Sequence, residues 1–178
     1  MILLSGWNGQ SDFLDPMCGS GTIPIEAALI AHNMAPGLFR SQYAFEKWKD
    51  FDKDMFETVY NDDSAERPFN FKIKGFDKDP KAIAVARRNA RAAGLADEID
   101  FEVRDFKDFE PIKERTVVIT NPPYGERLED KADLPALYKA FGDSYKRLDS
   151  WSAYMITSYE DTEKYFGRKA DKNRKIYN

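Results

Sequence analysis

The stretch that decides the fold reads Asp12-Phe13-Leu14-Asp15-Pro16-Met17-Cys18-Gly19-Ser20-Gly21-Thr22. Residues 12–15 predict a short strand that leads straight into a loop with two glycines, and a helix is expected from about Ile23. Pro24 suits the first turn of that helix, where a backbone N–H is not needed. Glycines in a strand-to-helix turn let the backbone approach a ligand that side chains would exclude. The stretch therefore predicts a ligand-binding loop at the carboxyl end of the first strand.

The rest of the chain alternates apolar runs with helical patterns, which indicates βαβ units and a largely parallel sheet. We expect four more strands, at Phe71 to Asp77, Ile99 to Val103, Thr116 to Thr120 and Ala153 to Thr157. We expect further helices at Asp79 to Gly94, Asp133 to Leu148 and Thr162 to Phe166, and the start of a last strand at Lys175 to Tyr177. The predicted fold is α/β, a Rossmann-like and mostly parallel sheet with helices on both faces.

Residues 33–70 interrupt this alternation. The segment is long for a connection between a helix and a strand, and it is rich in aromatic residues, which a plain linker would not be. We expect one or two helices here that pack on the edge of the domain, with Phe45, Trp48, Phe56 and Tyr60 partly buried. Packing is favoured over substrate contact, since aromatic side chains mostly fill cores.

Composition limits the class of protein. The 178 residues suit one compact domain, and 42% hydrophobic with 33% charged residues indicates a soluble globular chain. No apolar run approaches the roughly 18 residues that a membrane helix needs. Cys18 is the one cysteine, which excludes an internal disulfide and favours a cytoplasmic setting. Because His32 is also the one histidine, a Cys/His zinc cluster and a Ser-His-Asp triad are not expected, and no metal site is predicted.

The net charge of −4 argues against nucleic-acid binding through overall basicity. A nucleic-acid partner would have to meet local basic patches or a domain outside this chain. The densest basic stretch is Arg168-Lys169 with Lys172-Asn173-Arg174-Lys175, and Arg127 can meet a phosphate. Plain surface solvation is an equal alternative for both.

The glycine loop excludes two common nucleotide sites. A dinucleotide fold would place a third glycine three residues after Gly21, where Pro24 stands, and the Gly-Lys-Ser/Thr ending of a phosphate-binding loop is missing. Asp15, at the strand end, suits a ligand with a cationic or amino group, and S-adenosylmethionine has both. The pattern Asp-x-x-x-Gly-x-Gly resembles the first motif of class I methyltransferases, in which the loop wraps the methionine moiety and the acid lies near its amino end. The resemblance implies S-adenosylmethionine as cofactor, bound by Asp15, Pro16, Met17, Cys18, Gly19, Ser20, Gly21 and Thr22.

Asp77 ends the second predicted strand. Acids at this position commonly accept hydrogen bonds from ribose hydroxyls, although the usual spacing from the glycine loop is only about twenty residues. The insertion at 33–70 accounts for the greater distance. The predicted cofactor site includes Asp77 with the adjoining Lys78, whereas Asp79, before Pro80, is more consistent with a helix cap.

Asp105 and Phe106 follow the third predicted strand. The family resemblance implies that Asp105 binds the adenine amino group and that the Phe106 region packs against the adenine ring. Asp108 and Phe109 repeat the same two residue types. An exposed turn acid beside a core phenylalanine is the alternative.

Asn121-Pro122-Pro123-Tyr124 follows the buried fourth strand, at the sheet edge where α/β proteins bind ligands. Two prolines fix the backbone and remove two N–H donors, which leaves carbonyl acceptors. The Asn121 side-chain oxygen and the Pro122 carbonyl can accept the two hydrogens of an exocyclic amine and orient its lone pair toward a methyl group, so that Asn121 also meets the cofactor. Tyr124 offers a flat face on which a base can stack. Positioning then supplies most of the catalysis, and no strong general base is needed.

This tetrapeptide resembles the Asn/Asp-Pro-Pro-Tyr motif of amino methyltransferases that act on adenine N6, guanine N2 or a protein glutamine amide. Together with Asp-Pro-Met-Cys-Gly-Ser-Gly-Thr and Phe45-Glu46-Lys47-Trp48, it makes the chain similar to bacterial 23S rRNA guanine-N2 methyltransferases, whose catalytic domain follows a THUMP domain. The resemblance implies 23S rRNA or its precursor as partner, with the THUMP region and the last antiparallel strand of the fold outside this chain. A DNA adenine-N6 or a protein glutamine-N5 methyltransferase is the enzymatic alternative. A cofactor-binding RNA module without catalysis is disfavoured, because Asn121 and Tyr124 are both present.

Overall fold

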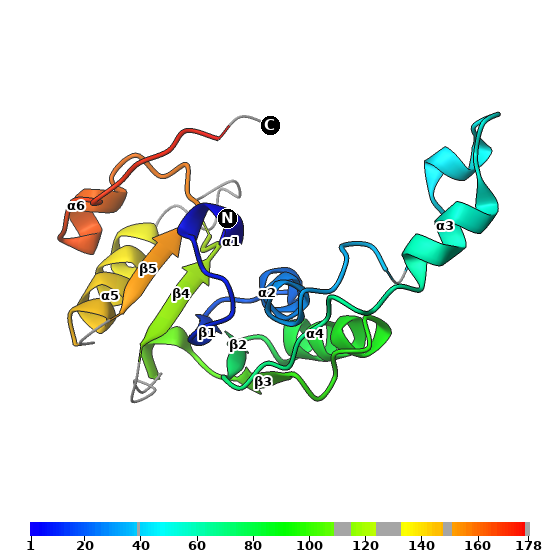
Figure 1. Ribbon diagram of the computed structural model, residues 1–178. Coiled ribbons are helices and arrows are strands. Elements are labelled where there is room, and N and C mark those ends of the chain that lie inside the picture. The colour runs from blue at the N-terminus through cyan, green and yellow to red at the C-terminus, as the bar shows by residue number, and fades with distance from the viewer. Residues whose placement is uncertain (39, 109–114, 124–132, 148–150, 177–178) are drawn as a thin grey trace.

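A computed structural model describes residues 1–38, 40–108, 115–123, 133–147 and 151–176 (Figure 1). Five strands form one sheet: β1 (Asp12–Asp15), β2 (Ile73–Asp77), β3 (Ile99–Val103), β4 (Thr116–Thr120) and β5 (Ser152–Met155). Their order is β3-β2-β1-β4-β5, and every neighbouring pair is parallel. The predicted α/β fold with a mostly parallel sheet is confirmed.

β1 is the central strand and is paired on both sides. Phe13 faces Ile73 of β2 on one side and Val117 of β4 on the other. The chain builds the sheet outward from β1 through β2 to β3, and then crosses back to add β4 and β5. Strand order therefore reverses between β1 and β4, and in open α/β sheets ligands bind at the carboxyl ends of the strands beside such a reversal.

Helices cover both faces of the sheet. On one face, α1 (Ile2–Ser5), α2 (Thr22–His32) and α4 (Pro80–Ala92) contribute to a core that includes Phe13. On the other face, α5 (Leu134–Lys146) packs over a core that includes Leu14, and α6 (Thr162–Phe166) packs on α5. Phe13 and Leu14 enter opposite cores because successive side chains of a strand point to opposite faces. No helix in the described ranges is long and apolar enough to cross a membrane.

Several boundaries follow the sequence closely. β1, β3, β4 and α6 have the predicted bounds, and the predicted cap of α4 is confirmed because the Asp79 carboxylate accepts from the Lys81 N–H at 2.8 Å, with Pro80 in the first turn. β2 begins at Ile73 rather than Phe71, since the Lys72 N–H donates to the Asp12 side chain at 2.8 Å. β5 lies one to two residues earlier than predicted, and α5 ends at Lys146.

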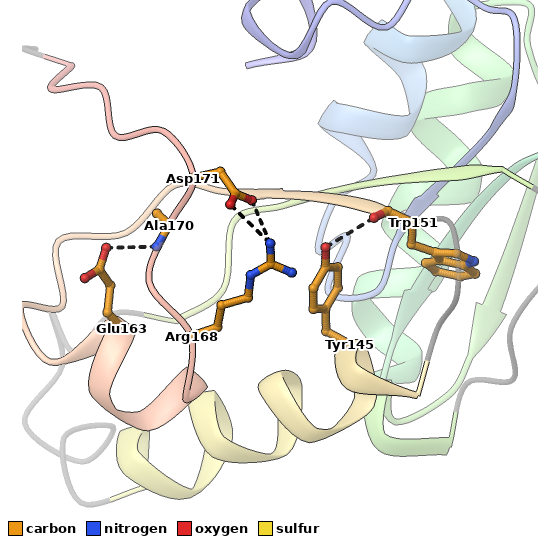
Figure 2. A network of polar contacts seen from close by, with 6 residues as sticks. All are labelled: Tyr145, Trp151, Glu163, Arg168, Ala170 and Asp171. Atoms are coloured by element: carbon orange, nitrogen blue, oxygen red, sulfur yellow. Dashed lines mark hydrogen bonds and ion pairs between the residues drawn. The ribbon is translucent and has the colours of Figure 1, made fainter.

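The end of the described chain corrects one prediction. Residues 172–176 form no strand, and Tyr177 lies outside the described residues. The chain after α6 is held by its own side chains instead. Glu163 Oε1 accepts from the Ala170 N–H at 3.0 Å, and Arg168 forms an ion pair with Asp171 at 3.1 Å (Figure 2).

The insertion also differs from expectation. It forms a 3-10 turn, η1 (Ala44–Lys47), and a helix, α3 (Lys53–Tyr60), which stands away from the sheet and its helices in Figure 1. Packing on the edge of the domain is therefore wrong, and we call residues 40–66 the arm. Its aromatic rings pack on one another: the Phe56 ring centroid lies 5.6 Å from Phe45 and 5.3 Å from Tyr60. These three side chains are partly buried as predicted, but Trp48 is 69% exposed.

Arg67, directly after the arm, binds the chain to the end of α2. Its guanidinium donates to the carbonyls of Ala31 at 2.8 Å and Ile30 at 3.1 Å, and also to Asn8 at 2.8 Å. The last carbonyls of a helix have no partner within the helix, and a cation there also suits the helix dipole. One side chain therefore satisfies the end of α2 and holds the returning chain beside it.

Candidate active site

The predicted site residues gather at the carboxyl ends of four adjacent strands. Asp15 ends β1 and Asp77 ends β2, while Asp105 follows β3 and Asn121 follows β4. Parallel strands bring all four to one edge of the sheet (Figure 1). The reversal between β1 and β4 lies within this group.

The glycine loop is hydrogen-bonded to the end of β2. The Cys18 N–H donates to the Phe76 carbonyl at 2.7 Å, and the Gly19 N–H donates to Asp77 Oδ2 at 3.0 Å. The glycines have different roles. A Cβ on Gly21 (φ 82°) would lie 2.9 Å from Phe101 Cζ, so this glycine permits close packing. A Cβ on Gly19 (φ 53°) would meet no atom within 4 Å, so this part of the loop borders open space that a ligand can fill.

Asp15 ties β1 to β4. Its carboxylate is buried, and Oδ1 accepts from Thr120 Oγ1 at 2.7 Å and from the Met17 N–H at 3.1 Å. Burial raises the pKa of Asp15 to about 7, although these two hydrogen bonds oppose the rise and the nearby Asp77 adds to it. Sequence reasoning missed Thr120, and the available signal was a polar residue at the end of a buried strand, directly before Asn121.

Asp77 organises the neighbouring turn. Its second oxygen accepts from the Asp79 N–H at 2.9 Å, so the carboxylate holds both the glycine loop and the start of α4. Each carboxylate oxygen keeps further acceptor capacity for a ligand hydroxyl. Lys78 is exposed and contributes no hydrogen bond to this arrangement among the described residues.

The pair after β3 divides between site and core. Asp105 Oδ1 accepts from the Lys107 N–H at 3.0 Å, and this side chain is partly exposed. The Phe106 ring is only 7% exposed and packs with Leu14, Val118 and Phe141 in the second core. Asp105 therefore remains a candidate ligand, whereas the Phe106 side chain serves mainly to pack the core.

The loop after β4 presents Asn121 to solvent, with Pro122 buried and Pro123 exposed. The Pro123 carbonyl accepts from the hydroxyl of Tyr138 at 3.3 Å. Tyr124 and Arg127, both predicted contacts, lie outside the described residues. The site thus combines a polar amide with a backbone held by a neighbouring helix.

The charges at this edge fit a cationic cofactor. The Asp77 carboxylate is close enough to raise the pKa of Asp15, and neither side chain forms an ion pair within the described part of the chain. A cationic ligand would lower the pKa of Asp15 from about 7 and so favour its charged form, and this coupling favours a ligand with positive charge. S-adenosylmethionine carries a sulfonium and an amino group, and the open space at Gly19 gives it access to the backbone. The residues present fit this cofactor.

Other chemistry finds less support. The Cys18 thiol is buried, and burial with the nearby Asp15 and Asp77 carboxylates raises its pKa well above the ordinary range. It therefore stays protonated and is a poor nucleophile. The described residues contain no group of three or more His, Cys, Asp and Glu side chains placed to hold a metal ion.

Comparison with known proteins identifies the family. The sequence model of the RMKL-like, methyltransferase domain family matches residues 1–178. The chain belongs to this family. The domain is 41% identical over 180 residues to "Putative RNA methyltransferase YpsC" of Bacillus subtilis, and 40% identical over 185 residues to ribosomal RNA large subunit methyltransferase K/L of Shewanella baltica. It is covered fully in both comparisons, but it spans only 46% and 26% of these relatives.

Solved structures agree with the fold. The domain superposes with a TM-score of 0.91 and 44% identity on SMU.472, "a putative methyltransferase complexed with SAH", covering 99% of this chain and 47% of the other. A possible methylase from Clostridium difficile 630 gives 0.91 and 49%, with the same coverage. An "N6-adenine-specific DNA methylase" from Listeria monocytogenes, so named as a prediction, gives 0.90 and 44%, again with 99% and 47% covered. These matches confirm the class I methyltransferase fold, and S-adenosylhomocysteine in SMU.472 confirms the cofactor class of the family.

Proposed function

We propose that this domain transfers a methyl group from S-adenosylmethionine to the exocyclic N2 of a guanine in 23S rRNA. The observation that carries the proposal is the meeting of the Asp15–Asp77 loop region with Asn121-Pro122-Pro123 at the reversal between β1 and β4. Support for RNA comes from the two curated relatives, which are named as RNA and large-subunit rRNA methyltransferases.

In this proposal the glycine loop and two acids hold the cofactor. When bound, S-adenosylmethionine supplies a methyl group made electrophilic by the adjoining sulfonium. Backbone at Gly19 can approach it without a side chain in between. In this proposal the charged form of Asp15 pairs with the positive charge of the cofactor, and Asp77 accepts hydrogen bonds from the ribose hydroxyls. Asp105 and the exposed Lys78 complete the proposed set.

The acceptor is positioned by the loop after β4. The Asn121 side-chain oxygen and the Pro122 carbonyl accept the two N–H groups of the guanine amine and direct its lone pair. Tyr124 stacks on the base, a contact worth about 1–3 kcal/mol. The amine loses a proton only after transfer, when its nitrogen is positive and acidic. The residues therefore act mainly by proximity and orientation.

RNA affinity is proposed to come mostly from elsewhere. The net charge of −4 gives the domain little general attraction for phosphates. The relatives are much longer than this stretch, and we propose that a THUMP domain supplies the main RNA contacts. The exposed basic residues at 168–175 can add local contacts to RNA. We propose that methyl transfer takes place in the cytoplasm.

Mass spectrometry of nucleosides from 23S rRNA and DNA, and of peptides from digested protein, tests the proposal in cells that lack the gene. Loss of N2-methylguanosine from 23S rRNA is expected, with recovery by the wild-type gene but not by Asn121→Ala. Asn61→Ala, an exposed asparagine of the arm, is the matched control and should restore the modification. Loss of N6-methyladenine from DNA, or of a methylated glutamine, would instead overturn the guanine assignment.

A further inference from the structure

A chain of three hydroxyl and amide groups leads to the Pro123 carbonyl. The Tyr159 N–H donates to Thr157 Oγ1 at 3.0 Å, and Thr157 Oγ1 lies 2.6 Å from the Tyr138 hydroxyl. The Tyr138 hydroxyl donates to the Pro123 carbonyl at 3.3 Å. Because a phenol has one proton, Thr157 must be the donor in its bond with Tyr138. We call the Tyr159 N–H, the Thr157 hydroxyl and the Tyr138 hydroxyl the relay. Each of these groups donates to the next, and the last one donates to the Pro123 carbonyl.

The relay connects two rigid elements to the loop after β4. Tyr138 belongs to α5 and is 1% exposed, and Thr157 follows the end of β5. The rings of Tyr138 and Tyr159 are in contact, with centroids 5.1 Å apart. Packing therefore fixes the Tyr138 hydroxyl before it meets the loop.

The hydrogen bond from Tyr138 to the Pro123 carbonyl, which we call the anchor, is important because two prolines stand in this loop. Prolines have no N–H, so neither peptide nitrogen can tie the loop to its surroundings. Their φ angles are also fixed, so holding the Pro123 carbonyl restricts the orientation of the Pro122 carbonyl and of Asn121 just before it. Loss of the anchor would let these two acceptors turn away from the position that the substrate amine requires.

We propose that Tyr138 is a positioning residue for methyl transfer, acting with Thr157 through the Pro123 carbonyl. This inference rests on the proposed amine methyltransferase function and extends it to a residue that does not touch substrate. It concerns the geometry of the acceptor, so the cofactor loop at the end of β1 should be unaffected.

The test compares variants of the full-length protein. Transfer of tritiated methyl groups from S-adenosylmethionine to 23S rRNA, isolated from cells lacking the gene, gives kcat and KM. Tyr138→Phe keeps the ring and removes the anchor, and kcat should fall about 10-fold, since small misplacements of reacting groups cost up to about 100-fold. The Kd of S-adenosylmethionine, measured by calorimetry, should stay within about twofold.

Tyr145→Phe is the matched control. Tyr145 lies on the same helix, and its hydroxyl donates to the Trp151 carbonyl at 3.2 Å, before β5 rather than after it (Figure 2). Tyr145→Phe removes one hydrogen bond to a carbonyl and should lose about 1 kcal/mol of stability. Tyr138→Phe also removes the bond from Thr157 and should lose somewhat more, so kcat is compared at a temperature at which both variants are fully folded. Only Tyr138→Phe should lose kcat.

Thr157 provides a second measurement. Thr157→Val removes the hydroxyl at nearly constant shape and should lower kcat in the same direction, whereas Thr157→Ser should recover most of that loss. The double variant Tyr138→Phe/Thr157→Val should be no slower than Tyr138→Phe, because both act through one carbonyl. A wild-type kcat for Tyr138→Phe, or an equal loss in Tyr145→Phe, would refute the positioning role. A wild-type protein that methylates no RNA amine would refute the proposed function itself.

Discussion

The hydroxyl of Thr120, at the end of β4, donates a 2.7 Å hydrogen bond to the buried carboxylate of Asp15, at the end of β1. This bond joins the two strands at which the strand order of the sheet reverses. It also places the residue before Asn121 in direct contact with the start of the glycine loop. The cofactor side and the acceptor side of the proposed site are thus connected by one pair of side chains.

Thr120→Val should destabilise the fold at this connection. Valine has the shape of threonine but no hydroxyl, so Asp15 keeps only the Met17 N–H among its present donors. A buried acceptor that loses a partner costs about 1–3 kcal/mol, and the free energy of unfolding in urea at pH 8 should fall by that amount. Thr120→Ser keeps the donor and should lose clearly less. Equal losses in the two variants would show that the hydroxyl is unimportant.

The stability of the protein should depend on pH through Asp15. Its pKa rises from 3.8 to about 7 in the folded protein, because burial disfavours the charged form. A group with a raised pKa contributes stability that is fully present below about pH 4 and is lost as pH rises to about 7. Asp15→Asn is uncharged and lacks this dependence. The variant should therefore gain stability relative to the wild type between pH 4 and pH 7, by on the order of 4 kcal/mol.

Urea unfolding at pH 4, 5, 6, 7 and 8 measures that difference, with each pH compared between wild type and variant. All other carboxylates are shared, so their titration largely cancels. A difference that stays constant across this range would show that Asp15 ionises normally in the folded protein.

Gly19→Ala should separate ligand binding from folding. Alanine at φ 53° is strained by roughly 1–2 kcal/mol, and its methyl group would occupy the open space beside the loop. Gly6→Ala places the same methyl group at φ 78°, also with no atom within 4 Å, at the end of α1 and outside the glycine loop. Both variants should lose similar stability. Calorimetry should show S-adenosylmethionine bound about 10-fold more weakly by Gly19→Ala alone, and equal affinities would contradict a ligand at Gly19.

Local patterns predicted the elements but not the contacts between them. Apolar runs predicted the bounds of β3 and β4, and an acid directly before a proline predicted the Asp79 cap, so each of these features depends on neighbouring residues. The Thr120–Asp15 bond joins residues 105 apart and the Tyr138–Pro123 bond joins residues 15 apart. Both depend on the order in which strands and helices are assembled, which periodicity does not specify.

The arm also shows that local patterns do not predict the contacts between elements. Its many aromatic residues correctly predicted burial for Phe45, Phe56 and Tyr60, but not which atoms would bury them. A cluster that packs on itself satisfies the same pattern as a helix that packs on the domain. The exposed Trp48 is the residue for which the two outcomes differ most.

Phe56→Ala should therefore unfold the arm without weakening the domain. The Phe56 ring contacts four others, those of Tyr43, Phe45, Phe51 and Tyr60, and its loss removes the centre of the cluster. Contacts of this kind contribute about 1.5–3 kcal/mol per buried side chain, which exceeds what an eight-residue helix can supply alone. Amide hydrogen exchange in α3 should accelerate by roughly 10-fold or more. Amides of β1 and β4 should keep their protection, because α3 makes no extensive contact with the described strands.

Trp48→Ala is the control, since this larger ring is mostly exposed and its loss should leave exchange in α3 unchanged. The thermal midpoint of the domain should stay the same in both variants. A lower midpoint in Phe56→Ala, together with faster exchange in β1 and β4, would show instead that the arm and the sheet unfold as one unit. In that case the arm would be part of the cooperative core.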